Sequence, residues 1–218
     1  MIVTQTKPIE EILAALTPKT KIFLIGCGEC ATSCQTGGEP QLKALKSQLE
    51  QAGKDVLGYC LPKAPCVAAQ IKTELAKNIP LLRQAEAVIV LSCGLGVQSF
   101  KDNDRLGLSV ISGCNTLAAA VMDAQGNFLE KCLLCSECLL SQTEGVCPVA
   151  LCPKGILNGP CGGMNKGKCE TDNERDCAWA LIYDRSIKAG HLEQFKKIKA
   201  PRDGRKYARP HKVILNPK

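Results

Sequence analysis

The sequence has little aromatic surface, because aromatic residues make up only 4% of its 218 residues. It also lacks any apolar run of the roughly 20 residues that a membrane span needs. Proteins that read nucleic acid usually stack bases on aromatic side chains, and only Tyr207 lies within the basic C-terminal stretch. The N-terminal segment carries Glu10 and Glu11 and has no small-residue cleavage site. We therefore expect a cytoplasmic protein with no membrane span, no secretory signal and no nucleic-acid partner.

Cysteine is the abundant residue, with 15 in the chain. An odd number of cysteines without an export signal argues against a fold held by disulfides. In a reducing compartment, so many thiols are better explained as thiolate ligands of metal. Histidine offers little competition, because the chain has two and both, His191 and His211, lie near the C-terminus, where we expect surface residues.

The net charge of +7 is unevenly distributed. Residues 185–218 hold 11 Lys or Arg against Glu193 and Asp203, whereas the rest of the chain holds 17 Lys or Arg against 19 Asp or Glu. Such a basic tail can bind an acidic surface or be solvated.

The first part of the chain alternates short apolar runs with helical patterns. Helical periodicity covers 40–53 and 67–80, where Pro80 is expected to end or kink the second helix. The apolar runs are continuous, as in strands buried on both faces, and they occupy 21–26, 55–59, 87–92 and 108–113. This order predicts an α/β domain over residues 1–126, with a flavodoxin- or Rossmann-like parallel sheet in the strand order 2-1-3-4.

After that domain the pattern changes. Residues 127–199 are rich in cysteine and glycine, with too little apolar periodicity to offset conformational entropy, so we expect a small metal-stabilised domain. Thr171 and Glu174 resemble a capping box that would begin a helix ending at Gly190. Residues 200–218 are expected to form a basic extended arm.

Cysteines follow the predicted strands of the first domain. In an open parallel sheet, ligands bind outside the carboxyl ends of the strands, where the strand order reverses, and this rule places Cys27 and Cys93 together. Cys30 and Cys34 share the loop of Cys27, so these four thiols are expected to hold one iron–sulfur cluster. The other cysteines of this domain are expected to pack as small side chains, with Cys60 left open as an alternative to Cys93: Cys60, Cys66 and Cys114.

The second domain contains the run Cys132-Leu-Leu-Cys135-Ser-Glu-Cys138. Bacterial ferredoxins use this spacing to bind three irons of a [4Fe–4S] cluster, with a fourth cysteine from elsewhere. Which cysteine completes the cluster stays open. Eight thiolates suffice for two four-ligand sites, of which the second could be another [4Fe–4S] cluster or zinc. The candidates besides the run are Cys147, Cys152, Cys161, Cys169 and Cys177.

Several segments resemble the methylenetetrahydrofolate reductase C-terminal family. They are the stretch from Cys147 to Glu170, the Cys177-Ala-Trp that follows it, and the N-terminal pieces GCGECATSCQTGG and VLSCGLGVQ. The resemblance implies the small iron–sulfur subunit of a two-subunit reductase in the methyl branch of the reductive acetyl-CoA pathway. Its partners would be a flavin-containing TIM-barrel subunit and an electron-donor protein.

On this interpretation the chain is a non-catalytic electron-transfer subunit that relays electrons through at least two [4Fe–4S] clusters. The alternatives are a zinc-stabilised interaction module and a redox adaptor for a different methyl-transfer or hydrogenase-type partner.

Overall fold

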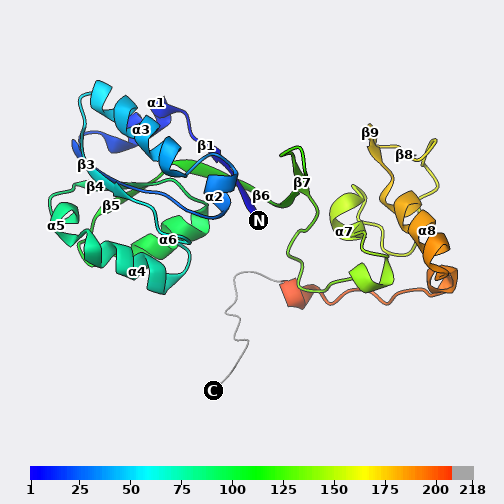
Figure 1. Ribbon diagram of the computed structural model, residues 1–218. Helices are drawn as coiled ribbons and strands as arrows, with labels where there is room; N and C mark the ends of the chain where they lie inside the picture. The colour runs from blue at the N-terminus through cyan, green and yellow to red at the C-terminus, as the bar shows by residue number, and fades with distance from the viewer. Residues whose placement is uncertain (208–218) are drawn as a thin grey trace, which may run out of the picture. The chain divides into compact units, whose positions relative to one another are not determined.

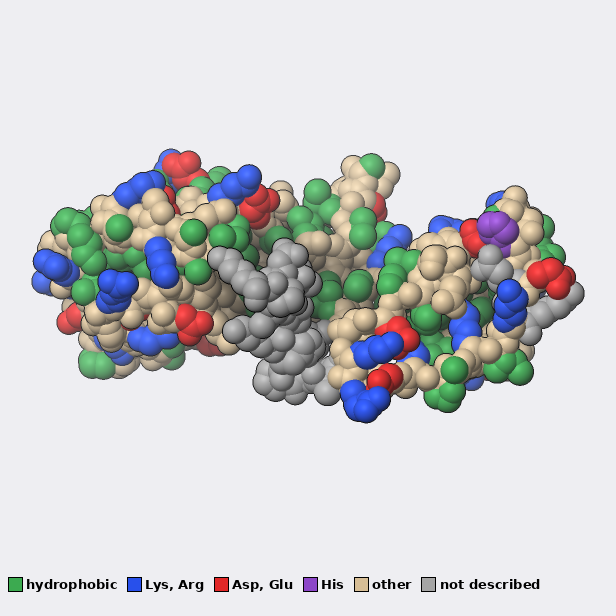
Figure 2. Space-filling view, turned by 90° about the horizontal axis from the view of Figure 1, so that it is seen from below, with side chains coloured by type: hydrophobic (Ala, Val, Ile, Leu, Met, Phe, Trp, Pro, Cys, Tyr) green, Lys and Arg blue, Asp and Glu red, His purple; other side chains and the backbone are tan. Residues whose placement is uncertain are grey.

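The computed structural model describes residues 1–207. The chain divides into two compact units, one comprising residues 1–118 and the other beginning at Ala119. Most of the basic arm expected over 200–218 lies outside the described residues. Within residues 1–207, no helix is long and apolar enough to cross a membrane. Basic and acidic side chains are interspersed over the visible face of the first unit (Figure 2).

The first unit is built on a four-stranded parallel sheet (Figure 1). The strand order is β3-β2-β4-β5, which is the predicted order 2-1-3-4. The strands are β2 (Lys21–Ile25), β3 (Asp55–Cys60), β4 (Ala87–Val90) and β5 (Ser109–Ser112). The predicted α/β class and strand order are therefore confirmed.

Helices cover both faces of this sheet. On one face lie α1 (Ile9–Leu16) and α3 (Glu39–Gln51), and on the other lie α4 (Ala68–Lys77), α5 (Ile79–Leu82) and α6 (Gly94–Asn103). The predicted helix over 67–80 is interrupted as expected, since Pro80 lies in the first turn of α5.

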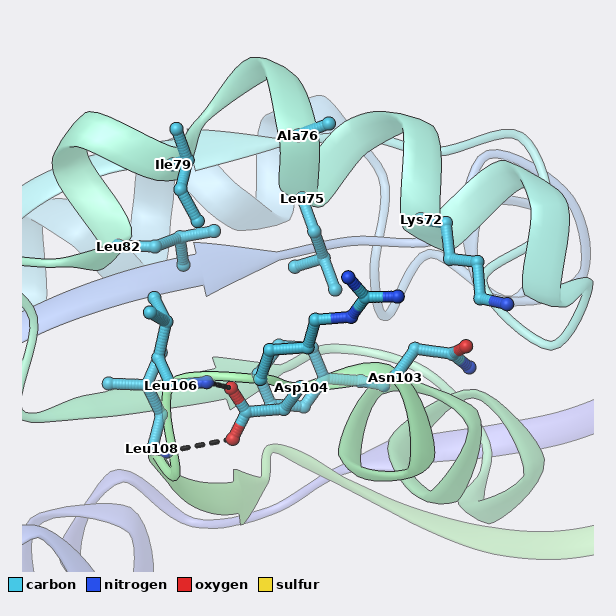
Figure 3. Close-up of a pocket in the computed structure, with 11 residues that line it drawn as sticks. Lys72, Leu75, Ala76, Ile79, Leu82, Asn103, Asp104, Leu106 and Leu108 are labelled. Atoms are coloured by element: carbon cyan, nitrogen blue, oxygen red, sulfur yellow. Dashed lines mark hydrogen bonds between the residues drawn. The ribbon is translucent and has the colours of Figure 1, made fainter.

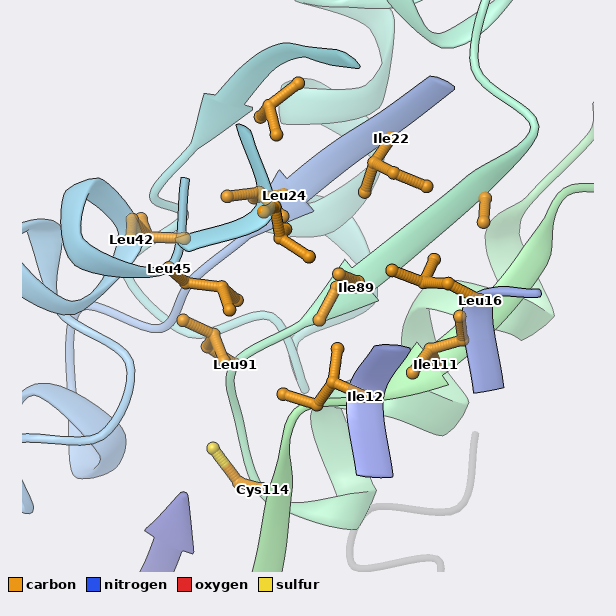
Figure 4. Close-up of a cluster of buried hydrophobic side chains, with 13 residues drawn as sticks. Ile12, Leu16, Ile22, Leu24, Leu42, Leu45, Ile89, Leu91, Ile111 and Cys114 are labelled. Carbon is orange, nitrogen blue, oxygen red and sulfur yellow. The ribbon is translucent and has the colours of Figure 1, made fainter. Parts of the chain in front are cut away.

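Strand β2 shows why the apolar runs of this unit are continuous. Its residues alternate between the two cores: Ile22 and Leu24 pack with α1 and α3, whereas Phe23 and Ile25 pack with α4, α5 and α6 (Figure 4 shows the first core). A strand buried on both faces needs apolar side chains at every position.

A second sheet, of order β1-β6-β7, was not predicted. Its strands are β1 (Ile2–Thr6), β6 (Cys114–Met122) and β7 (Phe128–Glu130). Strands β6 and β7 form an antiparallel hairpin in which Val121 faces Leu129. Gly126 lies in the turn of this hairpin with φ 88°, a conformation that glycine adopts readily.

The second unit has short elements and a small core. Four residues make up its buried cluster: Val146, Ala178, Trp179 and Ile182. The elements are α7 (Pro148–Leu151), β8 (Lys168–Cys169), β9 (Asp172–Asp176) and α8 (Ala178–Ala189), with 3-10 turns at Leu140–Gln142, Leu192–Lys196 and Gly204–Tyr207.

The predicted capping box is wrong. Thr171 and Glu174 lie in the β8–β9 hairpin, and the Thr171 hydroxyl lies 3.2 Å from the Cys169 sulfur instead of capping a helix. Helix α8 begins only after Cys177, whose N–H donates to the Gly167 carbonyl at 2.8 Å. Its predicted end is correct, because Gly190 adopts φ 73° as the left-handed cap.

Candidate metal centres

The carboxyl edge of the parallel sheet carries cysteines from three connections. Cys27 follows β2, Cys93 follows β4 and is the N-cap of α6, and Cys66 lies just before α4 in the connection that follows β3. Because β3, β2 and β4 are parallel neighbours, their carboxyl ends meet at one edge.

Electrostatic coupling shows that the thiols of the β2 and β4 connections lie near one another. Burial raises the pKa of the Cys27 thiol, and negative charge at Cys30 or Cys93 raises it further. Hydrogen bonds from the backbone of Ala31 and Glu29 act in the opposite direction by favouring the Cys27 thiolate. The structure thus brings together Cys27, Cys30 and Cys93 of the predicted ligands.

Cys66 belongs to the same group, although its position just before a helix favours packing as a small side chain. Burial raises the pKa of the Cys66 thiol, and the next causes are the charges of Cys93, Cys27 and, more weakly, Cys30. The signal that could have revealed Cys66 was present in the sequence. It follows the predicted strand over 55–59, which the predicted strand order places directly beside the strand of Cys27.

Cys34 and Cys114 direct their sulfurs to backbone oxygens. The Cys34 sulfur lies 3.7 Å from the Ile2 carbonyl of β1, and the Cys114 sulfur lies 3.7 Å from the Thr36 carbonyl. Figure 4 shows Cys114 at the margin of the core formed with α1 and α3.

Cys60 lies in the opposite core, among residues such as Phe23 and Ile71. Burial raises the pKa of the Cys60 thiol to about 12, and Glu74, rather than another cysteine, is the next contributor. The structure therefore places this thiol in an apolar environment away from the other six of the unit.

Close backbone packing holds the loop of Cys27 in place. The Cys27 N–H donates to the Gly37 carbonyl at 2.9 Å, and the Gly37 N–H donates to the Ala31 carbonyl at 3.1 Å. A Cβ at Gly37 would overlap the Leu91 carbonyl, so only glycine allows this loop to lie directly against the connection that follows β4.

In the second unit, four cysteines line one small cavity of about 20 Å³. Cys152 ends α7, Cys161 lies in a loop, Cys169 ends β8, and Cys177 is the N-cap of α8. Residues separated by up to 25 positions thus converge through one short helix, one hairpin and the start of a second helix.

Polar groups surround these sulfurs. The Gly163 N–H donates to the Cys161 sulfur at 3.4 Å, and the Cys161 thiol also lies 3.4 Å from a carboxylate oxygen of Glu170, which is paired with Lys154. The pKa of the Cys169 thiol is lowered, first by hydrogen bonding to Thr171. A lowered pKa favours the thiolate that a metal ligand requires.

The other four cysteines of this unit are Cys132, Cys135, Cys138 and Cys147, the last being the N-cap of α7. The first three lie in a segment without helix or strand.

Backbone and cationic groups act on two of these sulfurs. The Leu134 N–H donates to the Cys132 sulfur at 3.4 Å. Burial opposes ionisation of Cys135, but hydrogen bonding to the Glu137 backbone and the guanidinium of Arg202 outweigh it and lower the pKa of the thiol overall.

In the part of the chain that the structure describes, no three His, Cys, Asp or Glu side chains converge closely enough to hold a single metal ion. His191, whose ring lies 2.8 Å from the Glu144 carboxylate, is accounted for by that contact. Ligands of an iron–sulfur cluster each bind a different iron, so they need not converge on one point.

A larger cavity of about 430 Å³ lies between α4, α5 and α6 and contains no cysteine (Figure 3). Its walls are mostly apolar. The Asp104 carboxylate accepts hydrogen bonds from the N–H groups of Leu106 and Leu108, at 2.8 and 2.7 Å, and so fixes the loop before β5. This cavity is separate from the cysteine groups described above.

The fold and the sites define an α/β protein with thiols gathered at the carboxyl edge of its sheet and a second, cysteine-rich unit. Residues 111–205 match the family model described as "Methylene-tetrahydrofolate reductase C terminal". The resemblance seen in the stretch from Cys147 to Glu170 is therefore confirmed for this segment, and it associates the protein with methylenetetrahydrofolate reductase. No curated protein and no solved structure matches the chain.

Proposed function

We propose that this protein is the electron-transfer iron–sulfur subunit of a methylenetetrahydrofolate reductase complex. The observation that carries the proposal is the gathering of thiols at the carboxyl edge of the sheet, in a chain whose second unit matches the reductase family. That edge is where open α/β sheets bind their ligands.

Thiolate-bound [4Fe–4S] clusters accept and release one electron at a time, whereas a flavin on the large subunit combines two such electrons into a hydride. Reduction of the methylene group of the folate to a methyl group consumes two electrons and two protons. The chain must therefore relay two electrons in succession from a one-electron donor protein, while the protons come from solvent.

The residues of this chain supply the ligands and adjust the potential. Backbone hydrogen bonds to Cys27, and the Leu134 N–H that points to Cys132, favour the negatively charged, reduced form of a bound cluster. Arg202 acts in the same direction at Cys135, and its guanidinium also donates to the Cys135 and Glu137 carbonyls at 3.2 Å.

We assign the CxxCxxC run and Cys147 to one cluster, because Cys152, Cys161, Cys169 and Cys177 already share a cavity. That cavity has about the volume that one small ion or water molecule occupies. Four thiolates with such a small central space suit a structural zinc ion better than a four-iron cluster, but in the described residues the sulfurs do not yet lie close enough together to hold one ion. Binding would require the four sulfurs to close on the ion and Cys161 to release Glu170.

Exposed leucines beside the CxxCxxC run support a protein partner. Leu133 and Leu134 expose 52% and 54% of their surface, and Leu140 is also exposed. We propose that these side chains contact the large flavin-containing subunit, which would remove them from water and shield the adjacent cluster.

Elemental analysis of the full chain, purified without oxygen, tests this function. We expect about eight irons and about one zinc per chain, and an electron paramagnetic resonance signal of reduced [4Fe–4S] clusters after treatment with dithionite. A folded protein that contains zinc but no iron would refute electron transfer. Twelve irons and no zinc would refute only the zinc assignment.

A further inference from the structure

The connection from β3 to α4, residues 61–67, is held firmly against the loop of Cys27. The Gly28 N–H donates to the Pro62 carbonyl at 2.9 Å, and the Ala64 N–H donates to the Gln70 side chain at 2.6 Å. Two prolines restrict the backbone further. The residues that precede Cys66 therefore have a defined path along the carboxyl edge of the sheet.

The same connection also packs against the residues that follow β4. A Cβ at Gly96 would lie 3.0 Å from the ring of Pro65, so Pro65 lies against the first turn of α6. Cys93 is the N-cap of that helix, and Gly96 donates its N–H to the Cys93 carbonyl at 2.9 Å. Cys66 follows Pro65 directly, so the chain path brings it to Cys93.

Electrostatics agree with this path. After burial, the charge of Cys93 raises the pKa of the Cys66 thiol most, and the charge of Cys27 comes next. Burial raises the pKa of the buried Cys114 thiol, a hydrogen bond to Thr36 lowers it, and the charges of Cys34, Cys93 and Cys27 raise it further. The Cys34 sulfur itself is directed to the Ile2 carbonyl of β1, 3.7 Å away.

We propose that Cys66, together with Cys27, Cys30 and Cys93, forms the ligand set of the cluster at the carboxyl edge of the sheet. Cys66 takes the place expected for Cys34. This inference rests on the proposed function for the kind of cluster, but the ligand set follows from how the three connections pack on one another.

The ligand set gives the site a solvent-facing side. Cys27 and Cys93 are buried, with 6% and 8% of their surface exposed, whereas Cys66 is exposed. Cys66 therefore binds the iron nearest to solvent, which is the side from which an electron-transfer partner can approach.

Two matched substitutions in the oxygen-free full chain test the ligand set. Cys66→Ala should remove about four irons per chain, whereas Cys34→Ala should retain the iron content of the unsubstituted protein. Retention of all iron by Cys66→Ala would overturn the proposal. An unsubstituted protein without iron would instead refute the proposed function.

Alkylation of the unsubstituted protein gives a second test that does not depend on how a variant folds. Cys66 is exposed, so iodoacetamide should modify it rapidly once the clusters have been removed by chelation, and at least tenfold more slowly before. Peptide mass spectrometry measures both rates. Equal rates with and without bound iron would overturn the assignment of Cys66 as a ligand.

Discussion

On the proposed function, removal of all bound metal should unfold the second unit and leave the first unit folded. The two units differ sharply in buried apolar side chains. The first has two clusters with 13 and 10 buried residues, whereas the second has one cluster of four, in which Val146, Trp179 and Ile182 are the large side chains.

The magnitude follows from these three side chains. Burying each contributes about 1.5–3 kcal/mol to the free energy of unfolding, and together they contribute about 5–9 kcal/mol. A structural zinc site contributes about 10–16 kcal/mol. On the proposed function, the zinc ion would contribute more than these three buried side chains together, so their packing alone would not keep the unit folded after its loss.

Trp179 makes the experiment selective, because it is the only tryptophan of the chain. Its ring is 5% exposed, packs edge-on against Phe195 at 5.6 Å, and donates its N–H to the Ile156 carbonyl at 2.9 Å. Chelation should therefore shift its fluorescence emission to the wavelength of indole in water. Over the same treatment, peptides from β2 and β4 should keep their protection from hydrogen exchange.

A variant with Trp179→Phe serves as the control, since it should show no such emission at any stage. Elemental analysis must establish that no iron or zinc remains. If the metal-free protein then still emits as a buried indole, the second unit folds without metal and the reasoning from its small core is wrong.

Three further outcomes are expected. Burial raises the pKa of the Cys60 thiol to about 12, so this thiol should resist alkylation at pH 8 until the first unit is unfolded. Peptide mass spectrometry measures the modification, and rapid alkylation of the folded protein would contradict the placement of Cys60 in the core. Glu86 accepts hydrogen bonds from the N–H groups of Thr20 and Lys21, and these bonds lower the pKa of its carboxyl group. The stabilisation of the fold by Glu86 is therefore complete above the pKa of the unfolded state and is lost as the pH falls through the pKa of the folded state. Thermal melts should show less acid destabilisation in Glu86→Gln, and identical pH profiles would refute this role. Gly37→Ala should lower the free energy of unfolding by roughly 1–3 kcal/mol, because the added Cβ would overlap the Leu91 carbonyl oxygen. Gly94→Ala is the control and should leave the free energy of unfolding nearly unchanged, because its Cβ would have no contact nearer than 3.6 Å. Denaturant titrations measure both variants, and equal effects would contradict the packing at Gly37.

The parallel sheet was predictable because its central strands repeat one sequence pattern, a short unbroken run of apolar residues. Strands buried on both faces need unbroken apolar runs, and β2 and β4 have them. Once the strand order was inferred, the rule about carboxyl ends also brought Cys27 and Cys93 together. Both inferences depend on local pattern plus one general topological rule.

The second sheet was not predictable by the same means. In β6, Leu117 and Val121 are exposed, and its small residues show no clear alternation. Strand β1 finds its partner in β6, more than 100 residues away in the sequence, and a single sequence gives no direct sign of such a pairing.

The β8–β9 hairpin of the second unit was not predictable for a related reason. Thr171 and Glu174 have the spacing of a capping box, but tight hairpins favour the same polar residue types. The pairing of β8 with β9 and the hydrogen bond from the Cys177 N–H to the Gly167 carbonyl place Thr171 in the hairpin, and neither contact is visible in the local spacing of polar residues. The nearness of Cys66 to Cys93 depends on how Pro65 packs against the first turn of α6, which the sequence of its own connection does not show.

The small apolar core of the second unit links the cellular abundance of this protein to the supply of metal. If metal is needed to fold that unit, newly synthesised chains in a metal-deficient cell would have a folded first unit and an unfolded second unit. Proteases act on such open segments, so the abundance of the subunit would follow the supply of metal without any dedicated regulator.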